Sequence, residues 1–297
     1  MRSRFVVTLF LIASTAALSG CGPTLFAVRL DRPAHAGDKV RLAASGERHN
    51  DLTVLSHGTI VQRRHEDLLA RLDAAASVVS VDEAGRAVVS EYAIARFEAG
   101  PEGALKPLLT AGQKLTVRRA RDKKLTEITV AGVPVDEPIR SALDLVVSLV
   151  SPTGADDDEA LGTKEPQPLG ATWPIRGDVA SRSLSRDGLA VTLAGHTTLV
   201  RRTQFQSVDC LEFAGEMTGV VNVFPNLPPG AIVRTSRLEA KFHGMKPVRA
   251  ALPTLLSGES MKLDAVIDVR PPGGDDAQTI EVRVVYREAK EETVTPL

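Results

Sequence analysis

The chain has 297 residues, of which 43% are hydrophobic and 25% are charged, a composition that suits one large globular domain or two modest ones. Its 36 lysine and arginine residues nearly balance its 37 acidic residues, so the net charge is −1. This balance argues against nucleic-acid binding, which needs a basic footprint, and against adhesion to anionic lipid by charge alone.

The N-terminus has the organisation of a secretory signal peptide. Arg2 and Arg4 precede an apolar run at 5–18, and small residues lead to Cys21. A positive region followed by a short apolar region and a small-residue cleavage site is typical of exported proteins. The run is shorter than the roughly 20 apolar residues that span a bilayer. We therefore predict a signal peptide at residues 1–20.

The motif Leu18-Ser19-Gly20-Cys21 resembles the lipobox of bacterial lipoproteins. The resemblance implies that cleavage falls between Gly20 and Cys21, that the Cys21 thiol receives a diacylglycerol and that the new amine is acylated. Two or three acyl chains give stable anchoring where one does not. In lipoproteins of enteric-type bacteria, aspartate directly after the cysteine favours the inner membrane; residue 22 is glycine, so the resemblance implies the outer membrane, facing the periplasm. The alternative is an ordinary signal peptide followed by a chance cysteine.

Residues 21–36 have little periodicity and read as a lipid-anchored tether, with one short strand at 24–30 as an option. Residues 37–150 form a predicted N-terminal β half. A strand at 86–97 follows the turn residues 82–85, and a hairpin joins 114–120 to 125–130. Residues 62–76 fit either a helix, through Leu68, Leu69 and Leu72, or part of one long strand.

One helix is predicted at 138–150. Asp136 can cap its N-terminus and Pro138 suits its first turn. The apolar residues then recur at helical spacing and make a single stripe: Ile139, Ala142, Leu143, Val146, Val147 and Val150. We expect this stripe to pack on the apolar face of a sheet.

Residues 151–170 contain prolines, glycines and the acidic run 156–159, and we predict a mobile linker there. A C-terminal β half at 171–288 follows, with a tail at 289–297. Its strands alternate apolar and polar residues, as in 261–269 and 280–287, over lengths that exceed the usual strand. The predicted fold class is mainly β, with long antiparallel strands in curved sheets or half-barrels and two halves that resemble a degenerate repeat.

The layout resembles a family of uncharacterised bacterial lipoproteins with no assigned activity. The shared features are the lipid cysteine, the Gly37-Asp38 entry to a first long strand, an entry to a second strand set from Gly170 to Trp173, and a long final hairpin. The resemblance implies no functional residues. Long strands with a packed helix are also similar to half-barrel lipid carriers of the envelope, by analogy of fold alone.

No catalytic, cofactor or metal motif is present, so we predict no catalytic residues, no cofactor and no metal. The candidates weighed were dispersed histidines, the acidic run as a calcium loop, a basic cluster, Trp173 as a sugar platform and Cys210 as a reactive thiol. We favour solvated or core roles for all of them. The histidines are His35, His49, His57, His65, His196 and His243, and the basic cluster is Arg118, Arg119, Arg121, Lys123 and Lys124.

Three functions follow from these observations. The first is a membrane-anchored, non-enzymatic binding or structural β domain whose partner is an apolar ligand or an envelope protein. The second is an envelope hydrolase whose site forms only in the fold, for which two or more of Asp209, Glu212, His196 and His243 would share a cleft. The third is a half-barrel carrier of lipid or another apolar ligand. Nucleic acid is not expected as a partner.

Overall fold

The structure is a computed structural model that describes residues 24–119, 126–147, 149, 157–184, 190–224, 227–270 and 279–297. The predicted signal peptide, Gly20 and Cys21 lie outside these residues, as do the hairpin tip at 121–124 and Val150. In the part of the chain that is described, no helix is long and apolar enough to cross a membrane.

The chain is mainly β, and its strands are long. In chain order the strands are β1 (Leu25–Phe26), β2 (Lys39–Ser56), β3 (Thr59–Val81), β4 (Ala87–Gly100), β5 (Lys106–Leu109), β6 (Lys114–Arg118), β7 (Glu127–Val130), β8 (Val133–Pro134), β9 (Gln167–Pro168), β10 (Thr172–Pro174), β11 (Ala190–Phe205), β12 (Val208–Val223), β13 (Ile232–Pro247), β14 (Leu256–Val269) and β15 (Ile280–Pro296). The helices are α1 (Glu137–Asp144), α2 (Asp157–Ala160) and α3 (Gly177–Leu184).

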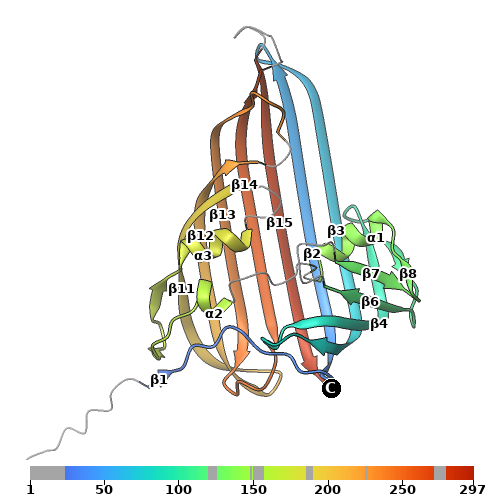
Figure 1. The fold of residues 1–297 in the computed structure, drawn as a ribbon, viewed down its shortest axis with the longest axis vertical. Coiled ribbons are helices and arrows are strands. Elements are labelled where there is room, and N and C mark those ends of the chain that lie inside the picture. The colour runs from blue at the N-terminus through green and yellow to red at the C-terminus, as the bar shows by residue number, and fades with distance from the viewer. Residues whose placement is uncertain are drawn as a thin grey trace, which may run out of the picture.

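One antiparallel sheet of 13 strands forms the body of the protein (Figure 1). Its order is β10-β11-β12-β13-β14-β15-β2-β3-β4-β6-β7-β8, with β5 paired to β4, and β1 and β9 form a separate pair. The hairpin of β6 and β7 is antiparallel, as predicted. The predicted mainly β fold with long antiparallel strands is confirmed.

The last strand joins the two predicted halves. β15 pairs with β2 from Ile280 opposite Ser56 to Pro296 opposite Val40. The residues expected as a tail, 289–297, are therefore the last part of a central strand up to Pro296. The sequence gives no local signal for this, because the pairing partner lies at the other end of the chain.

Residues 62–76 lie within the strand β3. This strand pairs with β2 along most of its length, and with β4 from Leu69 to Val81. The side chains of Ala70, Leu72 and Ala74 are buried at alternate positions, which is the period of a strand. The helix-like spacing of the leucines is overridden because backbone hydrogen bonds to β2, and from Leu69 onward also to β4, hold this segment in the sheet.

Helix α1 begins as predicted and ends earlier. The Asp136 side chain accepts a hydrogen bond from the backbone N–H of Ile139 at 3.1 Å, the bond of an N-cap. The helix ends at Asp144, and Leu145 to Val147 continue in a turn, with Val147 N–H donating to Leu143 O at 2.8 Å. These turn residues stay buried. The apolar side chains of 145–147 therefore pack on the sheet although this segment is not helical.

The three helices in the described part of the chain lie on the same face of the sheet, which we call the helix face (Figure 1). α1 and the turn after it cover a core on β2, β3, β4, β6 and β7. α2 and α3 cover a second core on β11, β12, β13 and β14. Across the central strands, Tyr286 of β15 faces Leu263 in the second core, whereas Val294 of β15 faces Leu42 in the first.

Parts of the predicted tether and of the predicted mobile linker are packed. Val28 and Leu30, in the predicted tether, are buried in a third core with Trp173, Leu199 and Phe213. The described part of the predicted linker, from residue 157 on, contains α2 and β9, and its Asp158 carboxylate accepts the Leu30 N–H at 2.5 Å. The acidic run therefore has a structural partner that its composition does not reveal.

Candidate functional site

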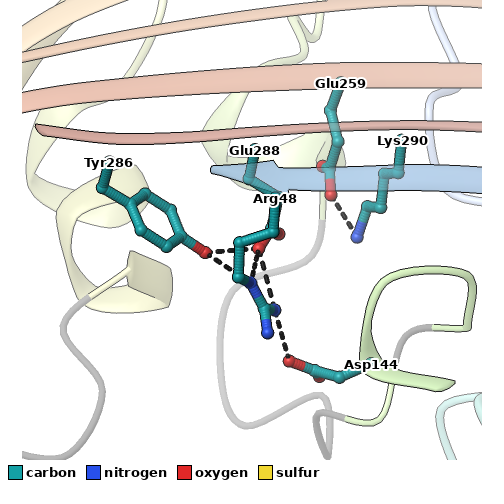
Figure 2. A network of polar contacts seen from close by, with 6 residues as sticks. All are labelled: Arg48, Asp144, Glu259, Tyr286, Glu288 and Lys290. Atoms are coloured by element: carbon teal, nitrogen blue, oxygen red, sulfur yellow. Dashed lines mark hydrogen bonds and ion pairs between the residues drawn. The ribbon is translucent and has the colours of Figure 1, made fainter. Parts of the chain in front are cut away.

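A polar network lies on the helix face between the two helix-covered cores (Figure 2). The Arg48 guanidinium is at its centre. Its Nε donates to Glu288 Oε2 at 2.9 Å and to the Tyr286 hydroxyl at 3.1 Å. Its Nη2 donates to Asp144 Oδ2 at 3.2 Å, and the Tyr286 hydroxyl donates to Glu288.

Strand register and the end of α1 bring these groups together. Arg48 on β2 lies directly opposite Glu288 on β15, and Tyr286 lies opposite Asn50, the next residue of β2 on the same face. Asp144 is the last residue of α1. One arginine thus connects the central strands to the helix, and each of its ion pairs is partly shielded from water.

The surroundings shift the ionisation of both central groups. Burial lowers the pKa of Arg48, but the interactions with Tyr286 and Glu288 outweigh it and the net shift is upward. Burial and the hydrogen bond to Glu288 raise the pKa of Tyr286. The guanidinium therefore stays charged and the phenol stays protonated at neutral pH, so these two groups offer a fixed cation and a hydroxyl.

Further charges continue along β15 and form a polar belt, which we define as Arg48, Glu288, Lys290 and Glu292. Lys290 forms an ion pair with Glu259 on β14 (Figure 2). Burial raises the pKa of Glu292, which lies one step further along the same face. Lys290 and Glu259 also contribute to the lining of a hollow of about 270 Å³, but most of its other lining residues, including Lys241, His243 and Glu291, have the register of the opposite face.

Beyond Tyr286, towards the β2–β3 turn, the same face becomes apolar. We call this region the apolar stripe. It comprises the helix-face residues of four adjacent strands: Leu52 and Val54 of β2, Val282 and Val284 of β15, Leu263, Ala265 and Ile267 of β14, and Leu238 of β13. The β13 and β14 members are buried, and those of β2 and β15 are half-buried. Charged and apolar surface therefore meet at Tyr286.

The sequence-predicted candidates do not assemble a reactive site. Cys210 is fully buried, and burial raises the pKa of its thiol, so it is a core residue and not a nucleophile. Trp173 is buried and its Nε1 donates to Leu161 O at 2.8 Å. This ring belongs to a core and presents no stacking platform.

The histidines lie apart, except for two on β2 and β3. His57 occupies the turn between those strands with a positive φ of 51°. His65 bonds to Asp51 at 2.5 Å and Asp67 at 2.8 Å, and His49 bonds to Asp67 at 2.6 Å. These are carboxylate contacts on an exposed surface, and the described residues contain no group of three or more side chains arranged to hold a metal ion.

The basic cluster is only partly described. Arg118 pairs with Glu127 across the hairpin at 3.6 Å. Arg119 turns inward, and its Nη1 donates to Ala87 O at 3.4 Å and to Ser90 Oγ at 3.3 Å. Arg121, Lys123 and Lys124 lie outside the described residues. The two described arginines thus have protein partners.

The four residues considered for a hydrolase have four different partners. Asp209 pairs with Arg202, Glu212 with Arg201, His196 with Glu216, and His243 with Glu291. None of these described contacts joins two of the four to each other. The arrangement is that of separate surface ion pairs.

Sequence analysis missed the Arg48 network. One signal was available: along β15 the helix-face positions read Val282, Val284, Tyr286, Glu288 and Lys290. Charges thus replace apolar residues halfway along a face that is otherwise apolar. Such a break marks a place where the face is not covered by a helix.

Comparisons with known proteins give little further guidance. No protein-family model matches the chain, and no curated protein does. Among solved structures, the chain is similar to one that describes lipid–protein interactions in lipovitellin, with a TM-score of 0.36 and 8% identity over 88% of this chain. The chain spans 25% of the length of that protein.

Proposed function

We propose that this chain is a lipid-anchored protein of the bacterial cell envelope that binds an amphipathic ligand on its helix face and catalyses no reaction. The main observation in favour of such a ligand is the boundary at Tyr286 between the polar belt and the apolar stripe. The anchor rests on the lipobox and on the packing of the segment that follows it.

The described chain begins close in sequence to the proposed lipid. Only two residues of the sequence separate Cys21 from Thr24, where the described chain begins. Val28 and Leu30 then pack against the sheet, and the Lys246 ammonium donates to Leu30 O. Because so few residues separate the proposed lipid from this packed segment, the anchor would hold the β1 end of the molecule beside the membrane.

The long strands would then project away from the bilayer. β1 and the C-terminus lie at the end of the molecule opposite the β2–β3 turn (Figure 1). β3 runs from Thr59 to Val81, which at roughly 3.3 Å per residue gives a strand of about 75 Å. The helix face would offer a surface that extends from the membrane into the periplasm.

The ligand proposal follows from the two kinds of surface on that face. Arg48 and Lys290 supply cationic donors, each paired with a carboxylate. An anionic headgroup could replace these carboxylates as the hydrogen-bond acceptor. Val282, Val284 and Leu52 supply apolar contact next to it, where burial of a hydrocarbon chain is favourable. A phospholipid or another single molecule with a charged end and a hydrocarbon end fits this order.

The anchor is tested by Cys21→Ser in the producing cell. We expect the wild-type chain to take up labelled palmitate and to sediment with membranes, and the variant to do neither, since it has no thiol to acylate. Cys210→Ser is the matched control and should behave as wild type, because Cys210 is buried. Membrane retention and labelling of the Cys21 variant would exclude the anchor.

The ligand is tested by mass spectrometry of non-covalent lipid extracted from the purified chain. Val284→Asp places a charge in the apolar stripe, whereas Val285→Asp places the same charge one residue further along β15, on the opposite face. We expect co-purified lipid in wild type and Val285→Asp and its loss in Val284→Asp, with both variants folded by circular dichroism. Wild type free of lipid, or equal lipid in both variants, would refute the ligand and leave the anchor standing.

A further inference from the structure

Part of β3 forms a free edge of the sheet. β3 pairs with β2 from Thr59 onward, but its pairing with β4 begins only at Leu69. Among the described strands, none pairs with the outer side of residues 59–68 (Figure 1). These residues present unpaired backbone groups, which can form a ladder with another chain.

The direction of those backbone groups follows from the ladder with β2. Val78 N–H donates to Asp38 O, on the β2 side. The register is unbroken from Ser77 to Gln62, and in an antiparallel pair alternate residues bond to the same neighbour. Odd-numbered residues, including Arg63, His65 and Asp67, therefore direct N–H and C=O outward from the free edge.

Charged side chains on an edge usually prevent pairing, but here their order is self-complementary. The edge reads Gln62-Arg63-Arg64-His65-Glu66-Asp67-Leu68. If two copies pair antiparallel about a two-fold axis at His65, Arg63 faces Asp67 of the other copy and Arg64 faces Glu66. Axes at Arg63, Arg64 or Glu66 each place two like charges opposite each other.

A two-fold axis perpendicular to the sheet also restricts the register. It keeps each face of the sheet on the same side in both copies, so two residues that face each other must lie on the same face. This condition holds only if one residue of β3 faces its own counterpart across the axis. At His65 the outward backbone groups allow the paired hydrogen bonds of a narrow pair. The ladder would run from Gln62 to Leu68 and stop where β4 begins to cover β3.

We propose that two copies of this chain associate through the free edge of β3, antiparallel and centred on His65, so that their sheets become continuous. In the single chain several of these charged side chains already form ion pairs, which would be replaced by pairs with the second copy at little cost. The Arg64–Glu66 pair and the contacts of His65 are exposed, and exposed pairs contribute little to stability. The proposal does not depend on the anchor or on the ligand.

Charge exchange between two variants tests both the partner and the register. One variant carries Arg63→Glu and Arg64→Glu, and the other carries Glu66→Arg and Asp67→Arg. We expect sedimentation velocity of the full chain in excess detergent to show a wild-type dimer and two monomeric variants, and their equimolar mixture to form a heterodimer. The cross-strand pairs predict dissociation constants raised at least about 30-fold in each variant alone.

A crosslink gives a second measure. At the axis, facing Cα atoms lie about 5.5 Å apart, within the range of a disulfide, so His65→Cys should form a covalent dimer on oxidation. Arg63→Cys is the control, because its two copies would be offset by roughly 13 Å. The proposal is overturned by a monomeric wild type at micromolar concentration, by a dimer that survives either double substitution, or by a mixture that stays monomeric.

Discussion

Gly46 of β2 lies in close contact with the turn after α1. A Cβ atom built on Gly46 would lie 2.3 Å from the backbone oxygen of Leu145 and 3.0 Å from its Cβ. Gly46→Ala therefore places a methyl group where a peptide carbonyl already sits. The backbone of β2 cannot move aside locally, since it pairs with β3 on one side and with β15 on the other.

The cost of this methyl group follows from what must move. Leu145 and Leu143 are fully buried, so the turn has to shift by about an ångström as a packed unit. Overpacking of this kind costs about 1–3 kcal/mol, and we expect the upper part of that range because the atom displaced is backbone. For a domain of this size the loss corresponds to a fall in Tm of roughly 4–10 °C.

Differential scanning calorimetry measures the change, and amide hydrogen exchange locates it. We expect Gly46→Ala to lower Tm and to accelerate exchange in α1, because the helix packs less tightly when its turn is displaced. Ser45→Ala is the matched control: it changes the adjacent, exposed residue on the opposite face and should stay within the small range of surface substitutions. Equal Tm values and equal exchange for the two variants would show that Gly46 does not set the contact with α1.

Three further substitutions probe other parts of the fold. Burial raises the pKa of Glu292 above its ordinary value of 4.5, so folding favours the protonated carboxyl and stability falls as pH rises through the folded pKa. Glu292→Gln should therefore be more stable than wild type at neutral pH in urea unfolding. Parallel profiles of unfolding free energy against pH for the two proteins would contradict this. Ser236→Ala removes the hydroxyl that accepts from Val221 N–H at 2.8 Å and donates to Val221 O at 2.9 Å. It should cost about 1–3 kcal/mol in urea unfolding, against little change for the exposed Thr235→Ala, and equal losses would argue against this bridge. Trp173→Phe leaves the Nε1 bond to Leu161 O unmade and should cost about 1 kcal/mol by the same measurement; an unchanged midpoint would show that this bond does not stabilise the third core.

Much of the secondary structure could be predicted because its causes are local. The alternation in β14 and β15 identifies strands, since neighbouring side chains point to opposite faces. The N-cap at Asp136 and the hairpin of β6 and β7 follow from residues within one turn of each other. The lipobox needs only adjacent residues, and its lipidation remains a prediction.

The Arg48 network could not be predicted, because its members come from three elements distant in sequence. Arg48 lies on β2, Asp144 ends α1, and Tyr286 and Glu288 lie on β15. The pairing of β15 with β2 alone decides that they meet. The same holds for Asp158, which composition assigns to solvent and which bonds to the Leu30 N–H.

The sequence by itself determined where long strands form and which of their faces is apolar, because side-chain alternation is a property of neighbouring residues. Tertiary structure alone decided that residues 62–76 are strand, since hydrogen bonds to β2 and β4 outweigh a leucine spacing that also fits a helix. It also decided which edge stays open and where charge meets apolar surface on the helix face. Both depend on the order of strands in the sheet, which is set by contacts between residues far apart in the chain.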